Sequence, residues 1–121
     1  YSKAIKTLMR YIKKNDKNPD AWNWLGYCFR KLAAQQTDPS EYYSFAMKYY
    51  NKALKLNPTH AGALEYQGEL FLSLRQIDNA TKNLDQLRSS CDQLDQNKQC
   101  ISEEFLDLKS AIAQYQEKQL N

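Results

Sequence analysis

The segments WNWLGYCF (residues 22–29) and LEYQGELF (residues 64–71) decide the fold, because they carry the same pattern 42 residues apart. In each segment a glycine, Gly26 or Gly68, stands three residues before a phenylalanine. Glycine in the middle of a helix costs roughly 1 kcal/mol relative to alanine. Since both glycines have the same neighbours, we expect another helix to use the space that the missing side chains leave.

A second pattern occurs three times, in KAIKTLMRY (residues 3–11), FAMKYYNKA (residues 45–53) and NATKNLDQL (residues 79–87). An alanine holds the same place in each copy. Ala46 and Ala80 are 34 residues apart, whereas Ala4 and Ala46 are 42 apart. The eight extra residues fall between Gly26 and Ala46, because the matching distance from Gly68 to Ala80 is eight shorter. The sequence therefore predicts two kinds of helix that alternate, with one insertion.

Each pair of helices is expected to be antiparallel, with small residues at the contact. Gly26 is predicted to face Ala46, and Gly68 to face Ala80, while a large residue such as Tyr50 fills the space that remains. The composition favours helix throughout, with only three glycines and three prolines in 121 residues. Hydrophobic residues make up 42% and charged residues 26%, as in a globular protein, and no apolar run approaches the roughly 18 residues of a membrane span.

This order of residues resembles the tetratricopeptide repeat (TPR), a unit of about 34 residues with the pattern W-x2-L-G-x2-Y, then alanine, an aromatic residue and proline. The first full unit supplies Trp22, Leu25, Gly26, Phe29, Ala46, Tyr50, Ala53 and Pro58. The second supplies Leu64, Gly68, Phe71, Ala80 and Leu84, and departs from the family at Gln67, Leu87 and Asp92. The resemblance covers about residues 1–90. It implies an all-α solenoid of helical hairpins, a right-handed superhelix with a concave groove.

Six helices are predicted, at residues 1–14, 18–34, 39–56, 60–74, 77–92 and 102–119. We expect one domain, 1–121, made of the second helix of a truncated repeat (1–17), a repeat with the insertion (18–60), a repeat (61–94) and a capping helix (95–121). The last helix carries an apolar stripe opposite a polar face, which is typical of a cap: Phe105, Leu108, Ile112 and Tyr115. Because the chain opens at Tyr1, we expect it to be a processed or trimmed piece of a longer protein. The missing upstream helix would leave apolar surface exposed, so we expect this piece to self-associate through its truncated N-terminal end.

The insertion corresponds to about one extra turn on each helix of a hairpin. It makes the second of these helices rich in aromatic residues, at Tyr42, Tyr43 and Phe45. These side chains either pack against Leu32 and Ala33 or form an exposed aromatic patch for a partner.

Polar residues and prolines mark the predicted helix ends. Asn18 and Asp38 each precede a proline and can cap the helix that follows. Asn57 stands before Pro58 and ends a helix. The sole histidine, His60, begins the next helix, where a capping or solvent-facing role is expected.

The resemblance also implies which residues line the groove, because the first helix of each TPR unit faces it. In this chain the corresponding positions are Asn23, Tyr27, Arg30, Lys31, Glu65, Glu69, Leu72 and Ser73. Some family members clamp a peptide carboxylate there with asparagine and lysine, but Tyr27, Glu65 and Glu69 do not fit such a clamp. The surface is expected either to hold a mixed-charge peptide or helix, or to be ordinary solvated surface.

Cys91 and Cys100 bracket a polar loop between the last two predicted helices. This ending is similar to that of bacterial exported TPR proteins, in which two cysteines flank a corner before an acidic helix start. The matching residues are Cys91, Cys100, Glu103, Glu104, Leu108, Lys109, Ala111, Ile112 and Tyr115. The resemblance implies a disulfide and an oxidising compartment such as the periplasm. The alternative is a cytoplasmic protein with two free thiols, and Cys28 is expected to be buried.

The net charge of +3 is unevenly distributed, since residues 1–18 carry +5 and the remainder −2. The first helix places Lys3, Lys6, Arg10, Lys13 and Lys17 along one face. This stripe either binds nucleic acid or an anionic surface, or is the solvated face of a packed helix. A general nucleic-acid binder is more often basic over its whole working surface.

No pattern indicates catalysis, a metal site or a cofactor: the chain has one histidine and lacks a glycine-rich phosphate loop. The sequence therefore predicts a non-enzymatic scaffold or adaptor that binds a protein or peptide, with no small-molecule substrate. Two alternatives stay open. One is a module that associates with nucleic acid or an anionic surface through the first helix, and the other is a docking segment of a larger enzyme.

Overall fold

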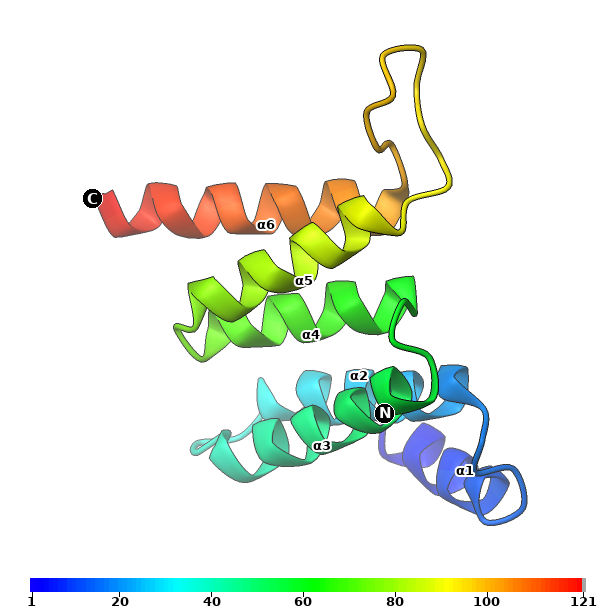
Figure 1. The fold of residues 1–121 in the computed structure, drawn as a ribbon. Helices are drawn as coiled ribbons and strands as arrows, with labels where there is room; N and C mark the ends of the chain where they lie inside the picture. Colours follow the sequence, from blue (N-terminus) through cyan, green and yellow to red (C-terminus); the bar gives the residue numbers. More distant parts are fainter. Residues whose placement is uncertain (121) are drawn as a thin grey trace. The chain divides into compact units, whose positions relative to one another are not determined.

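The computed structural model describes residues 1–120, and this part of the chain is helical. Its six α-helices are α1 (Ser2–Ile12), α2 (Pro19–Ala33), α3 (Ser40–Leu56), α4 (Ala61–Ser73), α5 (Ile77–Ser89) and α6 (Glu103–Leu120) (Figure 1). The predicted all-α fold is confirmed, and the predicted helix bounds are close to these. The largest error is at the end of α5, which stops at Ser89 because Cys91 already begins the loop that follows.

The fold divides into two compact units, residues 1–63 and residues from 64 onward. The boundary falls within the first turn of α4, three residues from the repeat boundary that the sequence predicts at residue 60. Charge follows the same division. Residues 1–63 hold eleven basic and four acidic side chains, a net charge of +7, whereas the remainder holds six basic and ten acidic side chains, a net charge of −4.

In the first unit α1, α2 and α3 enclose one hydrophobic core. Its buried members are Ile12, Ala21, Leu25 and Tyr49, and the partly buried side chains packed against them are Ile5, Leu8, Met9, Trp22, Phe29 and Phe45. Apolar residues of α1 recur three or four positions apart, so one face of α1 packs while its lysines point to solvent.

The contact between α2 and α3 depends on Gly26, as the sequence predicts. A Cβ atom at Gly26 would lie 2.6 Å from two ring carbons of Tyr50, closer than side chains pack. Tyr50 is fully buried, at 0% exposure, and Ala46, one turn earlier in α3, is also fully buried. The tyrosine ring occupies the volume that the glycine leaves.

The insertion is shared between the helices and the turn. Compared with the α4–α5 pair, two of the eight extra residues lengthen the end of α2, three lengthen the turn and three lengthen the start of α3. Tyr42 stacks on Phe29 with ring centroids 6.1 Å apart, and Phe45 lies 5.3 Å from the same ring. Tyr42 and Phe45 therefore pack within the hairpin, on Phe29. Their predicted packing against Leu32 and Ala33 stays a prediction.

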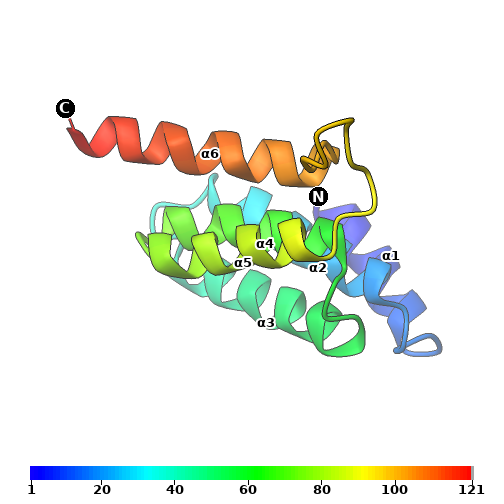
Figure 2. The ribbon, with the colours of Figure 1, turned by 45° about the horizontal axis from the view of Figure 1, so that its top comes forward.

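In the second unit α4 and α5 lie side by side and antiparallel (Figure 2). A polar link joins them, because the amide of Asn83 in α5 donates to the Leu64 carbonyl and to Oε1 of Gln67 at 3.1 and 3.0 Å. Gln67 is buried, and in the TPR pattern its place is held by leucine. This departure from the pattern is therefore satisfied by a partner on the neighbouring helix.

The atoms nearest to Gly68 belong to α6, which the sequence did not predict, and the contact with Ala80 of α5 stays a prediction. The atoms nearest to a Cβ at Gly68 are the two terminal methyl carbons of Leu108, both at 2.7 Å. Leu108 is fully buried, and Phe105 and Ile112 of the same predicted stripe are buried with it. The last helix thus completes the core of this unit, as expected of a terminal helix with one apolar face.

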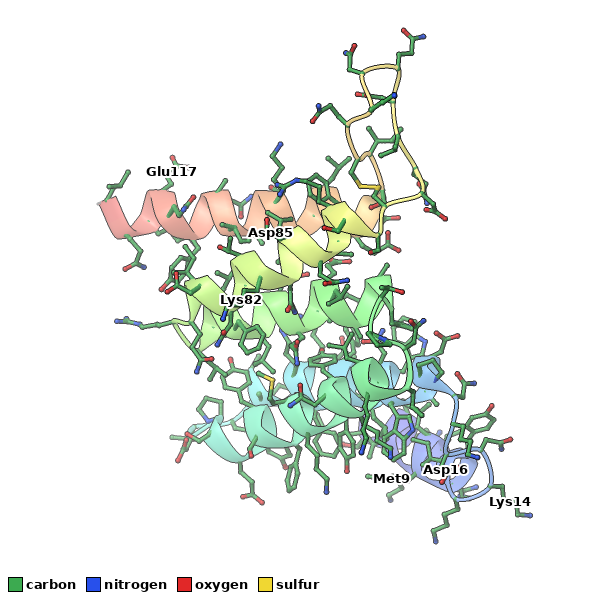
Figure 3. All side chains as sticks on the ribbon, in the orientation of Figure 1. Met9, Lys14, Asp16, Lys82, Asp85 and Glu117 are labelled. Carbon is green, nitrogen blue, oxygen red and sulfur yellow. A yellow bond between two sulfur atoms is a disulfide. The ribbon has the colours of Figure 1, made fainter. Side chains whose placement is uncertain are left out.

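A disulfide between Cys91 and Cys100 closes the loop between α5 and α6, as the resemblance implied, with the two Cα atoms 5.9 Å apart. Figure 3 draws this bond in yellow at the base of the projecting loop. Within the loop, Asp95 Oδ1 accepts from the backbone N–H groups of Asn97 and Gln99. Lys98 adopts a positive φ of 62° at the tip. The loop is therefore a small ordered hairpin held shut at its base.

Helix starts follow the predicted caps. Asn18 accepts a hydrogen bond from the Asp20 N–H at 3.0 Å, and Asp38 accepts one from the Ser40 N–H at 3.0 Å. The Nδ1 atom of His60 accepts from the Ala63 N–H at 3.0 Å, which caps α4. The other ring nitrogen therefore carries the proton, and it lies 2.6 Å from Asp20 Oδ1.

Candidate functional site

The residues predicted to line a groove differ in how much surface they offer. On α2, Asn23 is buried, at 4% exposure, whereas Tyr27, Arg30 and Lys31 are partly exposed. On α4, Glu65 and Leu72 are buried, Glu69 is partly exposed and Ser73 is exposed. The assignment of these residues to a binding groove stays a prediction, but Asn23, Glu65 and Leu72 present almost no surface to a partner.

Asn23 is buried by the corner that joins α3 to α4. A Cβ at Gly62 would lie 2.9 Å from the Nδ2 atom of Asn23 and 3.3 Å from a ring carbon of His60. The start of α4, at Gly62, therefore approaches the Asn23 side chain closely. Asn23 packs against the corner, which explains why it is not available as a surface ligand.

Glu65 is buried among other carboxylates of the second unit, at 8% exposure. Burial raises the pKa of Glu65 to about 9, and a hydrogen bond to Glu69 and the charges of Glu69, Asp107 and Glu104 act in the same direction. Glu65 is therefore neutral at pH 7. The predicted acidic wall at Glu65 and Glu69 carries less negative charge than the sequence indicates.

Trp24, which no sequence pattern singled out, is an exposed side chain on α2. Its indole is 47% exposed and meets Tyr27 edge to face, with ring centroids 5.7 Å apart. Tyr1, 52% exposed, contacts the other side of Tyr27 at 6.1 Å. Lys31 places its ammonium group 5.3 Å from the Tyr27 ring. We call Tyr1, Trp24, Tyr27 and Lys31 the α2 aromatic surface.

The signal for Trp24 is present in the sequence as the triplet Trp22-Asn23-Trp24. Two residues along an α-helix rotate by about 200°, so two tryptophans in positions i and i+2 cannot both face the same core. Trp22 packs on the hydrophobic core, and Trp24 points away from it. One exposed tryptophan was therefore predictable, although not which one.

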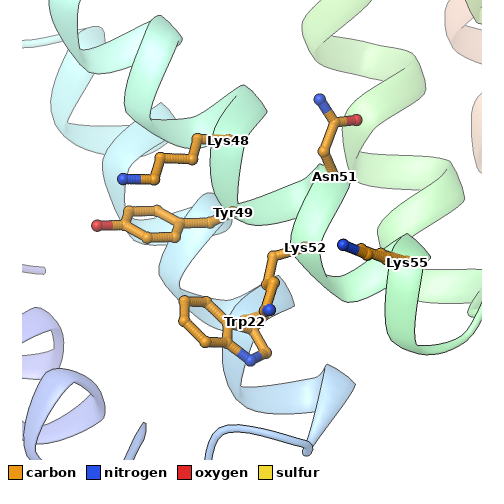
Figure 4. Close-up of a pocket in the computed structure, with 6 residues that line it drawn as sticks. All are labelled: Trp22, Lys48, Tyr49, Asn51, Lys52 and Lys55. Carbon is orange, nitrogen blue, oxygen red and sulfur yellow. The ribbon is translucent and has the colours of Figure 1, made fainter. Parts of the chain in front are cut away.

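Trp22 forms the floor of an open hollow of about 400 Å³ between α2 and α3. Figure 4 shows the six lining residues, which are Trp22, Lys48, Tyr49, Asn51, Lys52 and Lys55. The Trp22 and Tyr49 rings stack at 5.8 Å with an interplanar angle of 26°. The Trp22 Nε1–H donates to the Asp16 carbonyl at 2.8 Å, which fixes the indole in place.

Three lysines line the α3 side of this hollow, at Lys48, Lys52 and Lys55. The Lys48 ammonium lies 5.8 Å from the Tyr49 ring and the Lys52 ammonium 5.6 Å from the Trp22 ring. In residues 1–120 none of the three forms an ion pair with a carboxylate. We call this arrangement the lysine hollow, a basic rim over an aromatic floor.

A second hollow, of about 440 Å³, lies beside the disulfide-closed hairpin. Exposed apolar side chains surround it, at Leu94, Ile101 and Leu106. Arg88 and Lys109 lie over the Phe105 ring at its base, and Arg88 also pairs with Asp85. This hollow mixes both charges with apolar surface, so it has less charge selectivity than the lysine hollow.

Groups with catalytic or metal-binding chemistry are dispersed. No cluster of three or more histidine, cysteine or acidic side chains in the described residues could hold a metal ion. His60 is engaged by Ala63 and Asp20. Cys28 is a free thiol, buried as predicted, and burial raises its pKa, which disfavours the reactive thiolate. Within residues 1–120 no helix is long and apolar enough to cross a bilayer.

Comparison with known proteins adds no assignment. No protein-family model matches the chain, and no curated protein matches it.

Proposed function

We propose that the protein is a non-enzymatic scaffold of the TPR kind, which binds a protein or peptide partner through the α2 aromatic surface. The observation that carries this proposal is the exposure of Trp24, with Tyr1 and Tyr27 in edge contact beside it. A chain that leaves a tryptophan and a tyrosine exposed loses the free energy that burial of their apolar surface would contribute to folding. Tryptophan, tyrosine and arginine dominate binding energy at protein interfaces, so this cluster suits a docking surface.

Support for the TPR kinship is the repeated helix pair. The α2–α3 and α4–α5 pairs each carry a glycine at the same place in the first helix, and each glycine contacts a large buried side chain. The α2 aromatic surface lies on the first helix of its pair, the helix that faces the groove in the family. Tyr27 and Lys31, predicted from the resemblance, belong to this surface, and Trp24 extends it.

A site-specific crosslinking experiment tests the proposal. A photo-reactive amino acid is placed at Trp24, and partners are captured from the source cells with the intact protein. A matched version carries the same group at Leu106, which is similarly exposed on α6. We expect a discrete crosslinked protein from position 24 alone. After identification of that protein, Trp24→Ala should weaken its binding about 30-fold or more, the range of an interface hot spot. Equal labelling at both positions, or unchanged affinity, would refute the proposal.

We also propose an exported location, because the Cys91–Cys100 bond is compatible with an oxidising compartment. Thiol trapping in intact cells tests this. Rapid alkylation under denaturing conditions should modify Cys28 alone, and all three cysteines only after reduction. Modification of all three without reduction would place the protein in a reducing compartment.

The basic first helix provides the rival function. Lys3, Lys6, Arg10 and Lys13 are exposed, and none forms an ion pair in the described part of the chain. If α1 binds nucleic acid, charge reversal of Lys6, Arg10 and Lys13 should abolish binding, and affinity should fall steeply with salt. Binding through the α2 aromatic surface should be much less sensitive to salt.

A further inference from the structure

The lysine hollow lies on the other side of α2 from Trp24, and the proposed docking surface does not use it. Its aromatic floor is rigid, because Trp22 is held by the core, by Tyr49 and by its hydrogen bond to Asp16. Its rim carries three positive charges without a carboxylate partner in the described residues. All three lysines line the same hollow, and two of them lie over its aromatic floor, Lys48 over Tyr49 and Lys52 over Trp22 (Figure 4).

The charge of the rim determines the kind of ligand. The surrounding unit, residues 1–63, has a net charge of +7, so its field attracts anions and repels cations. Each lysine that rests over a ring still has N–H donors free to meet a carboxylate, since an ammonium group has three. The ligand is therefore acidic on one side and apolar on the side that meets the floor.

The spacing of the lysines determines the shape of the ligand. Lys48, Lys52 and Lys55 stand four and three residues apart on α3, which corresponds to rises of about 6 and 4.5 Å along the helix. In an extended peptide, side chains on one face repeat about every 6.6–6.8 Å. Acidic residues at alternate positions of an extended peptide can thus meet Lys48 and Lys52 together.

Single-stranded nucleic acid is a weaker fit. Proteins bind it by stacking bases on open aromatic faces. Here the Trp22 and Tyr49 rings stack on each other, and the Lys52 and Lys48 ammonium groups approach them. Tyr49 is also buried. A base would have to displace a lysine from the ring that it covers. A carboxylate can form an ion pair with the lysine in its present position.

We propose that the lysine hollow is a second binding site, which takes an extended acidic segment of a partner protein, with acidic side chains on Lys48, Lys52 and Lys55 and an apolar side chain within the hollow between them. The site goes beyond the α2 aromatic surface and does not depend on it. Its ligand can belong to the same partner or to a different one.

The probe is a fluorescein-labelled peptide of about nine residues with alternating glutamate and valine, and its counterpart has lysine for glutamate. We expect binding of the glutamate peptide only. Each single Lys→Gln change at positions 48, 52 and 55 should weaken binding about two- to five-fold, the range of an exposed ion pair, and the triple variant more than about ten-fold. The matched control is the triple variant K3Q/K6Q/K13Q, in α1 and at its C-cap, with the same change in charge. It should stay within about two-fold of wild type.

A second readout locates the peptide. In a Trp24→Phe variant, the only remaining tryptophan is Trp22, so its fluorescence reports on the hollow. We expect this fluorescence to change as the glutamate peptide binds. The inference is overturned if the peptide does not bind at about 1 mM, if the α1 control loses as much affinity as the hollow variant, or if oligothymidylate binds more tightly than the peptide. All of these results are independent of the Trp24→Ala test above.

Discussion

The Tyr50 ring occupies the place where a side chain at Gly26 would stand, with two ring carbons 2.6 Å from the ideal Cβ position. Neither partner can move aside easily. Tyr50 has no exposed surface, and Gly26 lies in the middle of α2. This contact sets the distance between α3 and α2, the helix that carries Trp22 and Trp24.

Gly26→Ala should destabilise the protein although alanine favours helix. The helix propensity of alanine contributes roughly 1 kcal/mol, but overpacking a filled core costs about 1–3 kcal/mol. We expect a net loss of about 1–2 kcal/mol in the free energy of unfolding, measured by urea denaturation. In a Tyr50→Leu background the same substitution should cost less, because the smaller side chain makes room. Equal losses in both backgrounds would contradict the assigned contact.

Glu65→Gln should change how stability depends on pH. The ordinary pKa of Glu65 is 4.5, and burial among Glu69, Glu104 and Asp107 raises it to about 9. Between these values the folded chain binds a proton that the unfolded chain does not. The contribution of Glu65 is therefore fully favourable below pH 4.5 and is lost as the pH rises toward 9, by at most about 1.4 kcal/mol per pH unit.

Urea denaturation of wild type and Glu65→Gln across this interval measures the effect. The variant is a neutral isostere and can still donate to Glu69. We expect the two proteins to be similar near the acidic end and the variant to be more stable at the alkaline end. Glu117→Gln, at an exposed position of α6, is the control and should not change the pH dependence. Parallel pH profiles for wild type and Glu65→Gln would contradict a buried neutral carboxyl.

Removal of the disulfide by a C91S/C100S double variant should lower the free energy of unfolding by about 2.5–3 kcal/mol, the loop-entropy value for a loop of this length. A thiol reductant should have the same effect on the wild type and none on the double variant. Cys28→Ala serves as the control, since it should leave the effect of the reductant unchanged. A reductant that does not alter wild-type stability would show that the bond contributes nothing to the folded state.

His60→Ala should cost about 1 kcal/mol, the usual value of a lost N-terminal cap. The loss arises because the Ala63 N–H, which now donates to His60 Nδ1, would have no side-chain acceptor. His60→Asn should lose less, since asparagine is a good cap but does not reach Asp20. Thermal denaturation of both variants checks the order. If the two variants lost the same stability, the contact with Asp20, which both of them lack, would be the main contribution.

The order and bounds of the helices were predictable because they depend on local signals. The patterns around Gly26, Gly68 and the alanines recur with one insertion, and Asn18, Asp38 and His60 mark helix starts. Contacts between distant parts of the chain were less accessible. Gly68 was expected to contact α5, since no local signal links it to Leu108, forty residues further on.

The binding surfaces show the same limit. Tyr27 and Lys31 followed from the family pattern. Helical geometry could have predicted that one of the two tryptophans, Trp22 or Trp24, is exposed. Asn23 and Glu65 were assigned to surface because a single helix cannot show what will cover it. The lysine hollow is formed by α2 and α3 together. It could not be predicted because the packing of these two helices brings Trp22 beneath Lys52. The spacing of residues on α3 alone predicts where the three lysines lie, but it does not show the aromatic rings beneath them.

The contact between Gly68 and Leu108 has a consequence for the nascent chain. The core cluster of α1, α2 and α3 lies within residues 1–63, so it can close while later residues are still being synthesised. The second unit has to wait, because the gap above Gly68 stays open until Leu108 has emerged from the ribosome. Until then α4 and α5 expose an apolar seam, the stage at which a molecular chaperone would have most to protect.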